Sequence, residues 1–263
     1  MNLIKSETQS ADGTVGKALL VLDQIANFDR PVRFSELQAI SNLPKATLYR
    51  LVQSLTNQGM LAFDEERHTY SPGLRLVKLA HSAWRQSSLA PVARLHIDAL
   101  AEKVQETIHL AQLDRGQVLY VDKRAASNPL EMFSQAGKIG LGYCTGVGKA
   151  MIAFLDPEAQ DAAIQQQAFF AHTPTTLASP DALLAELATI RAEGVAFDRE
   201  EHEPGIICIA APICTGNGRM IGAVSITAST QRNSLEGLLP HRDCLVSTAS
   251  EIATAAETWQ FPA

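Results

Sequence analysis

One stretch of this sequence, from Leu37 to Phe63, contains Lys45 and Arg50 but no Asp or Glu, although the whole chain carries a formal net charge of −6. Duplex DNA presents one phosphate charge per ~1.7 Å of its axis, so an acid on a surface facing it would be repelled. Arginine reads guanine, glutamine reads adenine, and threonine or alanine contacts the thymine methyl group. The residue types of this stretch therefore indicate contact with double-stranded DNA.

A helix that starts near Pro44 and ends at Gly59 would place these residue types on one face. Its buried side is predicted by four apolar residues at helical spacing: Leu48, Leu51, Val52 and Leu55. Ser35, as the N-cap of the preceding helix, and Arg33 would hold backbone phosphates. Lys17 from the first helix and Arg67 from a hairpin would do the same. We thus predict DNA contacts from ten residues: Lys17, Arg33, Ser35, Lys45, Ala46, Thr47, Tyr49, Arg50, Gln53 and Arg67.

A second candidate site is the segment Gly146 to Ala150, "GVGKA". A phosphate-binding loop for nucleotides needs a glycine five residues before Gly148 and a hydroxyl after the lysine, but Tyr143 and Ala150 occupy these positions. Nucleotide hydrolysis is therefore rejected. The first N–H groups of a helix beginning at Gly146 would favour a small anion. Alternatively, the glycines only permit a tight turn between a strand and a helix.

Polar residues within apolar strands form a third candidate. Ser225 and Thr227 are two positions apart and share one face of a strand, with Cys208 on a neighbouring strand. Such a face is either ordinary core or a pocket with a few aimed polar groups. Asp198 ends an apolar strand and is expected to turn inward. The consecutive residues 201–203 (Glu, His, Glu) cannot all face one point, so a solvated acidic loop is expected there and no metal site.

The elements that must position these residues divide the chain into parts. Residues 14–73 predict three helices and a two-stranded hairpin, the order of a winged helix-turn-helix domain, after a loose leader at 1–13. A linker helix is expected at 74–90 and an α/β domain at 91–260, which makes the fold class α+β. In the second domain helices are expected around 91–107, 145–155, 157–167, 179–194 and 235–259, and strands around 108–113, 117–125, 130–134, 194–198, 206–213 and 220–229. Its non-alternating apolar strands are expected to be covered on both faces.

Composition excludes several classes of protein. Of the 263 residues 46% are hydrophobic and 19% charged, as in a globular chain, and no apolar run is long enough to span a membrane. The four cysteines show no metal-binding spacing and are expected to be free thiols in a cytoplasmic protein. Residues 1–76 hold eight basic and eight acidic residues, so the whole acidic excess lies in the second part. This division suits a DNA-contacting part joined to a part with another role.

The segment "FSELQAISNLPKATLYRLVQSLTNQGML" resembles the winged-helix module of the IclR family of bacterial transcription regulators. "GYCTGVGKAMIAFL" and "GVAFDREEHEPGIICIAAPI" are similar to that family's GAF-like effector-binding domain. The resemblance implies a homodimer or a dimer of dimers on operator DNA, with a small organic, keto, sugar or aromatic acid as effector. It implies effector contacts from Gly146, Val147, Asp198, Ile206, Cys208, Ser225 and Thr227. Val147 and Thr227 stand where alanine and serine are common in the family.

The leading hypothesis is thus a ligand-responsive regulator, most often a repressor in this family, that controls a catabolic operon without enzymatic activity or cofactor. A second hypothesis is an enzyme built on the C-terminal α/β domain, with Cys208 or Ser225 as nucleophile. Neither residue has a base nearby in sequence or a nucleophile-elbow pattern around it. A third is an architectural DNA-binding protein without ligand, which the size of the second domain disfavours.

Overall fold

The division between the two parts of the chain falls inside a helix, α4 (Leu74–Ser87), with Ala83 ending one unit and Trp84 beginning the other. The computed structural model describes residues 13–126, 132 and 134–257. The expected leader therefore lies almost entirely outside the described residues. Each unit is described by itself below. No helix among the described residues is long and apolar enough to cross a membrane.

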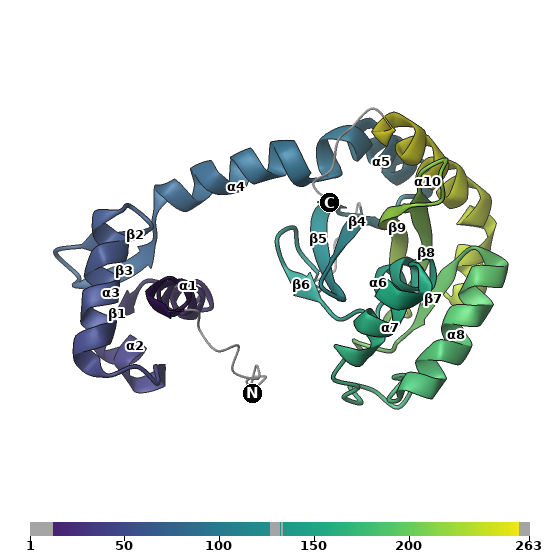
Figure 1. The fold of residues 1–263 in the computed structure, drawn as a ribbon. Helices are drawn as coiled ribbons and strands as arrows, with labels where there is room; N and C mark the ends of the chain where they lie inside the picture. Colours follow the sequence, from purple (N-terminus) through teal and green to yellow (C-terminus); the bar gives the residue numbers. More distant parts are fainter. Residues whose placement is uncertain (1–12, 127–131, 133, 258–263) are drawn as a thin grey trace. The chain divides into compact units, whose positions relative to one another are not determined.

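The N-terminal unit confirms the predicted winged helix-turn-helix architecture (Figure 1). Its elements are α1 (Gly13–Ala26), β1 (Val32–Arg33), α2 (Phe34–Ile40), α3 (Lys45–Asn57), β2 (Leu61–Asp64) and β3 (Thr69–Pro72). The strands form an antiparallel sheet in the order β1-β3-β2. One apolar core joins the three helices to this sheet, and it includes Ile25, Leu37, Leu48, Val52 and Leu61.

The start of α2 differs from the sequence prediction, because Arg33 rather than Ser35 is the N-cap residue. The Glu36 carboxylate accepts a hydrogen bond from the Arg33 backbone N–H at 2.9 Å and pairs with Arg30. A glutamate three residues after the cap thus satisfies the first free N–H group. Ser35 lies one position inside the helix. The end of α3 agrees with the prediction, since Gly59 follows it with a left-handed φ of 69°.

The C-terminal unit contains a six-stranded antiparallel sheet in the order β6-β5-β4-β9-β8-β7. Its strands are β4 (Thr107–Asp114), β5 (Gln117–Arg124), β6 (Ile139–Gly140), β7 (Ala196–Arg199), β8 (Ile206–Cys214) and β9 (Met220–Ser229). The strand expected at 130–134 is not supported, because Met132 and Ser134 have no regular structure and its other residues lie outside the described ones. The edge of the sheet beyond β5 is formed by β6, and the Gly137 N–H donates to the Tyr120 carbonyl at 2.7 Å beside it.

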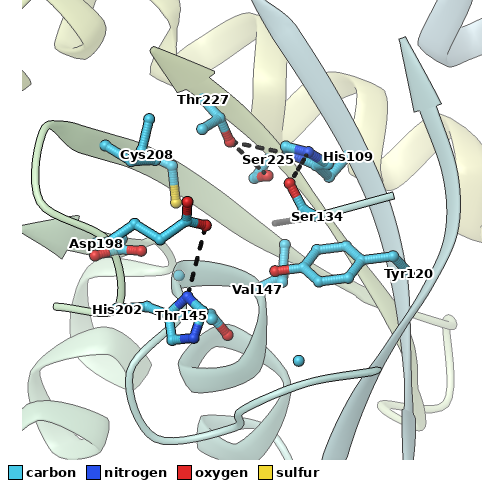
Figure 2. A pocket seen from close by; sticks show the side chains of 14 residues that line it. His109, Tyr120, Ser134, Thr145, Val147, Asp198, His202, Cys208, Ser225 and Thr227 are labelled. Atoms are coloured by element: carbon cyan, nitrogen blue, oxygen red, sulfur yellow. Dashed lines mark hydrogen bonds and ion pairs between the residues drawn. The ribbon is translucent and has the colours of Figure 1, made fainter. Parts of the chain in front are cut away.

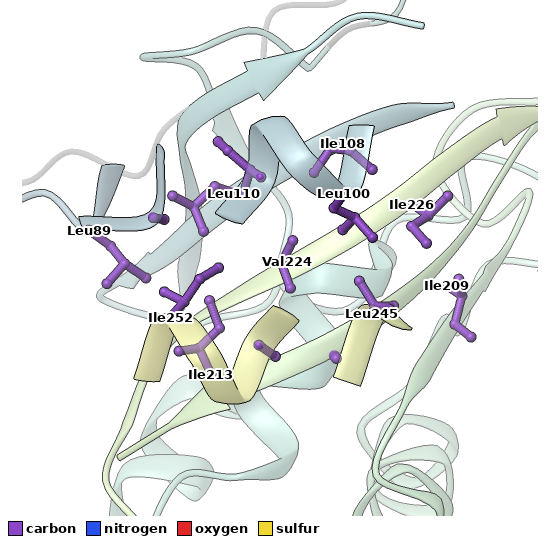
Figure 3. Close-up of a cluster of buried hydrophobic side chains, with 14 of the residues drawn as sticks. Leu89, Leu100, Ile108, Leu110, Ile209, Ile213, Val224, Ile226, Leu245 and Ile252 are labelled. Carbon is purple, nitrogen blue, oxygen red and sulfur yellow. The ribbon is translucent and has the colours of Figure 1, made fainter. Parts of the chain in front are cut away.

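Helices cover both faces of this sheet, as its apolar strands predicted. On one face lie α5 (Ala90–Val104) and α10 (Arg242–Ala256), and Figure 3 shows Leu100, Leu245 and Ile252 packed there against Val224 and Ile226. On the other face lie α6 (Gly146–Ala153), α7 (Pro157–Gln165) and α8 (Pro180–Glu193). The described residues therefore form helix, sheet and helix layers, and the fold class is α+β.

The single final helix predicted at 235–259 is interrupted. A short helix α9 (Leu235–Leu238) and a 3-10 turn (Leu239–His241) precede α10, and Pro240 lies within that turn. Proline lacks the N–H group that a continuous helix would need at this position. Residues 258 and 259 of the predicted helix lie outside the described ones.

Candidate functional site

The outer face of α3 carries the side chains expected to contact DNA. Lys45, Ala46, Tyr49 and Arg50 are exposed, and Thr47 and Gln53 are partly buried. The opposite face is buried in the core of the N-terminal unit through Leu48, Leu51, Val52 and Leu55. The amphipathic pattern therefore leaves a polar, basic surface free on one side of a helix held firmly on the other.

Two residues of this surface are positioned by neighbours. The Tyr49 ring packs edge-on against Phe34 with 5.7 Å between the ring centroids. The Gln53 side-chain amide donates to the Tyr70 hydroxyl at 3.4 Å, which ties α3 to β3. These contacts limit the rotamers of both side chains before any ligand binds.

The remaining predicted DNA contacts lie on other elements and are all exposed. Lys17 is on α1, Arg33 and Ser35 are at the start of α2, and Arg67 is in the turn between β2 and β3. Among the described residues none of the five basic side chains (Lys17, Arg33, Lys45, Arg50 and Arg67) makes an ion pair. Their charges are therefore available to phosphates.

All seven residues expected to contact an effector line one cavity in the C-terminal unit (Figure 2). They are Gly146, Val147, Asp198, Ile206, Cys208, Ser225 and Thr227. Sequence reasoning missed seven others that share the cavity: His109, Tyr120, Ser134, Gly140, Thr145, His202 and Glu203. The place of His109 in the cavity follows from the strand register, since β4 pairs His109 with Ser225 of β9.

A hydrogen-bonded chain of neutral groups forms one wall of the cavity. The Ser225 and Thr227 hydroxyls are 3.3 Å apart, and the Thr227 hydroxyl lies 3.1 Å from His109 Nδ1. His109 Nε2 lies 2.7 Å from the Ser134 hydroxyl. Burial, with a smaller effect of the Lys123 charge, lowers the pKa of His109 to about 3. The imidazole is therefore neutral near pH 7 and acts as a hydrogen-bonding group.

The opposite wall carries an acid and a thiol. Asp198 and Cys208 face each other across β7 and β8, and the Asp198 Oδ1 accepts the Glu201 N–H at 2.8 Å. Burial is the main cause that raises the pKa of Asp198 to about 7. Burial also raises the pKa of the Cys208 thiol, and Asp198 adds to this effect. A thiol held in its protonated form is a poor nucleophile.

The floor of the cavity is the start of α6, all of whose residues are buried. Thr145 caps this helix by accepting the Gly148 N–H at 3.2 Å. A Cβ atom on Gly146 would collide with the Cys208 sulfur. Gly146 is thus required by the close approach of α6 to β8, which brings the helix N-terminus into the cavity. Allowing a tight turn between strand and helix is therefore only part of the role of Gly146.

Behind the cavity a buried ion pair holds the loop after β7 against α6. The Lys149 side chain is fully buried and its ammonium group pairs with Glu201 and, at 3.3 Å, with Glu186. The Thr176 hydroxyl donates to the Glu201 carbonyl at 2.6 Å. The expectation of a solvated acidic loop is therefore wrong for Glu201, which is 2% exposed. A buried carboxylate is costly when its charge is unpaired, and Lys149 supplies the charged partner of Glu201.

The same residues bear on the alternative of an enzyme. Ser225 bonds to Thr227 rather than to the histidine, and burial beside Asp198 keeps the Cys208 thiol protonated, so neither side chain is arranged as an activated nucleophile. Among the described residues no group of three His, Cys, Asp or Glu side chains is arranged to hold a metal ion.

Comparisons with known proteins give the family. Residues 14–65 match the model of the IclR helix-turn-helix domain, and residues 81–254 match that of the bacterial transcriptional regulator IclR C-terminal domain. The chain belongs to the IclR family of bacterial transcriptional regulators. It is accordingly a DNA-binding transcriptional regulator.

Individual relatives cover almost all of the chain. It is 30% identical over 234 residues to the HTH-type transcriptional regulator KdgR of Escherichia coli K12, covering 89% of each chain. It is 26% identical over 241 residues to the transcriptional repressor IclR of the same strain, covering 91% of this chain and 88% of the relative. The structure of an IclR homologue from Microbacterium hydrocarbonoxydans complexed with 4-hydroxybenzoate matches with a TM-score of 0.78 at 24% identity, covering 92% of this chain and 98% of that one. This last likeness concerns the fold.

Proposed function

We propose that this IclR-family protein is a ligand-responsive repressor that binds operator DNA through α3 and senses a small organic acid in the cavity beside α6. The main support for effector sensing is that the seven residues expected to contact an effector, which come from four separate segments, all line one cavity. A core without a ligand function would fill such a space with apolar side chains, because unfilled volume and unpaired polar groups cost stability. Here hydroxyl, carboxyl, imidazole and thiol groups surround it instead.

The DNA half rests on the basic face of α3 and its buried underside. A helix held by Leu48 and Val52 can enter a major groove without losing its own support, and Arg50 on its outer face suits a guanine contact. The exposed Arg33 and Arg67 on neighbouring elements suit backbone phosphates. Catabolic genes fit a sensor for an organic acid, because the acid signals that its own breakdown is needed.

Ligand and DNA are coupled in this proposal by differential affinity of the effector for two arrangements of the DNA-binding units, with α4 as the covalent connection. We further propose a homodimer or a dimer of dimers. Val15 and Leu19, exposed to 71% and 53%, support self-association through α1, since exposed apolar side chains on one helix face favour burial against a second copy.

The test is a thermal-shift screen of the full chain with pyruvate, gluconate and 4-hydroxybenzoate, followed by gel shifts on the DNA that flanks its own gene. We expect at least one acid to stabilise the protein and to change operator occupancy. Salt-sensitive DNA binding is expected with or without acid, since phosphate contacts release counterions. Absence of any salt-sensitive binding to this DNA would contradict the regulator role, and hydrolysis of ester or amide substrates would favour the enzyme.

A further inference from the structure

Two polar groups of the cavity have no hydrogen-bond partner among the described residues on the side where a ligand would lie. The Tyr120 side chain is 7% exposed, and its hydroxyl points into the cavity without a bond to any other described residue (Figure 2). Asp198 is also 7% exposed, and only its Oδ1 is bonded, to the Glu201 N–H. The second carboxyl oxygen of Asp198 is therefore an acidic group that a ligand would meet, in addition to the Glu203 side chain that also lines the cavity.

The floor of the cavity attracts an anion, and the walls contain no lysine or arginine among the described residues. The Val147 N–H at the start of α6 donates no hydrogen bond to another described residue, and such an N–H group favours negative charge. Lys149 lies nearby but does not line the cavity, and its charge is already paired with Glu201 and Glu186.

Every element packed around Asp198 contributes a titratable group. These groups are Cys208 from β8, Tyr120 from β5, Cys144 before α6, Lys149 from α6, and Glu201, His202 and Glu203 from the loop after β7. The hydrogen bond from the Glu201 backbone N–H favours a charge on Asp198, as do Lys149 and His202, whereas the Glu201 carboxylate disfavours it. Burial outweighs all of them, so the carboxyl group changes its protonation state near neutral pH.

We propose that the cavity binds an organic anion together with one proton, which is carried by the Asp198 carboxyl group and donated in a hydrogen bond to the anion. This inference rests on the proposed sensing of an organic acid. Two anions repel each other in a buried site that no described Lys or Arg lines, and burying them unpaired is expensive. One proton taken from solvent by the free oxygen of Asp198 removes the repulsion and turns an acceptor into a donor. No covalent bond of the ligand changes.

The proton requirement sets the pH dependence of affinity. Only the protonated fraction of the free protein is competent to bind, so the apparent Kd is the intrinsic Kd divided by that fraction. With a pKa of about 7 for Asp198, the apparent Kd rises roughly 30-fold between pH 6 and pH 8.5. An acid that binds by donating its own hydroxyl to an ionised Asp198 would show the opposite trend and would release a proton.

The experiment is titration calorimetry of the full chain between pH 6 and pH 8.5, with whichever of pyruvate, gluconate and 4-hydroxybenzoate stabilises it at pH 6. Two buffers of different ionisation heat count the protons. We expect uptake approaching one proton per ligand above pH 7 and the roughly 30-fold weakening just given. Asp198→Asn keeps an oxygen for the Glu201 N–H and presents an NH2 donor to the cavity, so its affinity should not vary with pH and its proton uptake should vanish.

Two further variants identify the group that takes up the proton. Asp161→Asn removes one carboxylate from the exposed face of α7 and should behave like the wild type. His202→Gln removes the imidazole that lines the cavity and whose charge favours ionised Asp198, and it should retain the uptake. Loss of uptake in His202→Gln alone, no uptake in the wild type, or proton release would each overturn the proposal.

The wild-type proton count requires no variant to fold. If none of the three acids binds at pH 6 while operator binding persists, the class of effector is wrong and the proton-linked proposal fails with it. Binding of an acid without proton uptake leaves the proposed function intact and refutes only the proton linkage. The two failures are therefore distinguishable.

Discussion

Lys45 and Lys149 both lie near the start of a helix, yet Lys45 is exposed on α3 and Lys149 is fully buried in α6. The DNA-contacting surface comes mainly from one helix and needs only a firm underside and a free outer face. The cavity is assembled from segments between residues 109 and 227, and its floor helix is buried on all sides. A lysine in the first setting serves a partner, whereas in the second it balances an acid of its own chain.

The largest expected effect comes from removing the charge of the buried lysine and comparing it with removal of the exposed one. Lys149→Met leaves Glu201 buried without its partner and should destabilise the C-terminal unit by about 3–5 kcal/mol. Lys45→Met removes an exposed charge and should change stability by about 0.5 kcal/mol or less. Urea unfolding at pH 7 measures both. The double variant Lys149→Met with Glu201→Gln should recover part of the loss, and equal stability of the two single variants would show that the buried pair has no structural role.

A second effect sharpens the contrast through pH. Asp198 titrates near 3.8 when unfolded and near 7 when folded, so its contribution to stability is complete below about pH 4 and is lost as pH rises through 7. Asn cannot lose that proton. The stability of Asp198→Asn relative to wild type should therefore increase by roughly 4 kcal/mol between pH 4 and pH 8, since each pKa unit corresponds to about 1.4 kcal/mol. The measurement is denaturant unfolding at both pH values, with Asp161→Asn as control.

The contrast also explains how much the sequence could predict. Most of the DNA-binding unit can be predicted from residues that are close together in the sequence. The spacing of Leu48, Leu51 and Leu55 indicates the buried face of α3, and the glycine after it indicates where the helix ends. The sequence predicts a two-stranded hairpin and does not indicate β1, which pairs with β3 far along the chain. It also misplaces the N-cap of α2, because Ser35 and Arg33 both precede acceptable first turns and the bond from the Arg33 N–H to Glu36 decides between them. Nothing in residue type alone shows which N–H a glutamate will reach.

The cavity was only partly predictable for a different reason. Ser225 and Thr227 share a face because strands alternate, a local rule. His109 and Tyr120 join them through the pairing of β4 with β5 and β9, which depends on contacts far apart in the sequence. An acidic run such as residues 201–203 predicts a solvated loop. The burial of Glu201 depends instead on its pairing with Lys149, which lies 52 positions earlier in the chain. Contacts between residues far apart in the sequence therefore limit how much of the cavity can be predicted.

The third prediction concerns the exposed face of α3. Arg50→Ala should weaken operator binding by about 1–3 kcal/mol if the side chain reads a guanine, and the loss should be confined to operators carrying that base. Arg67→Ala, in the hairpin turn, should weaken binding to all sequences and reduce the salt dependence by about one counterion. Gel shifts with operator variants at several salt concentrations separate the two. Uniform loss for Arg50→Ala would assign it to a phosphate instead.

The smallest expected effect tests whether the hydroxyl chain of the cavity contacts the effector. Ser225→Ala removes one hydrogen-bonding group, and the net value of one such bond is about 0.5–1.5 kcal/mol, so the affinity for the stabilising acid should fall about 2- to 12-fold. Operator binding without the acid should remain unchanged, because Ser225 lies in the unit that does not carry α3. Ser250→Ala, on the exposed side of α10, is the matched control. Calorimetry gives the affinity and gel shifts give the response; an equal change in both variants, or unfolding of Ser225→Ala alone, would assign Ser225 to the core rather than to the site.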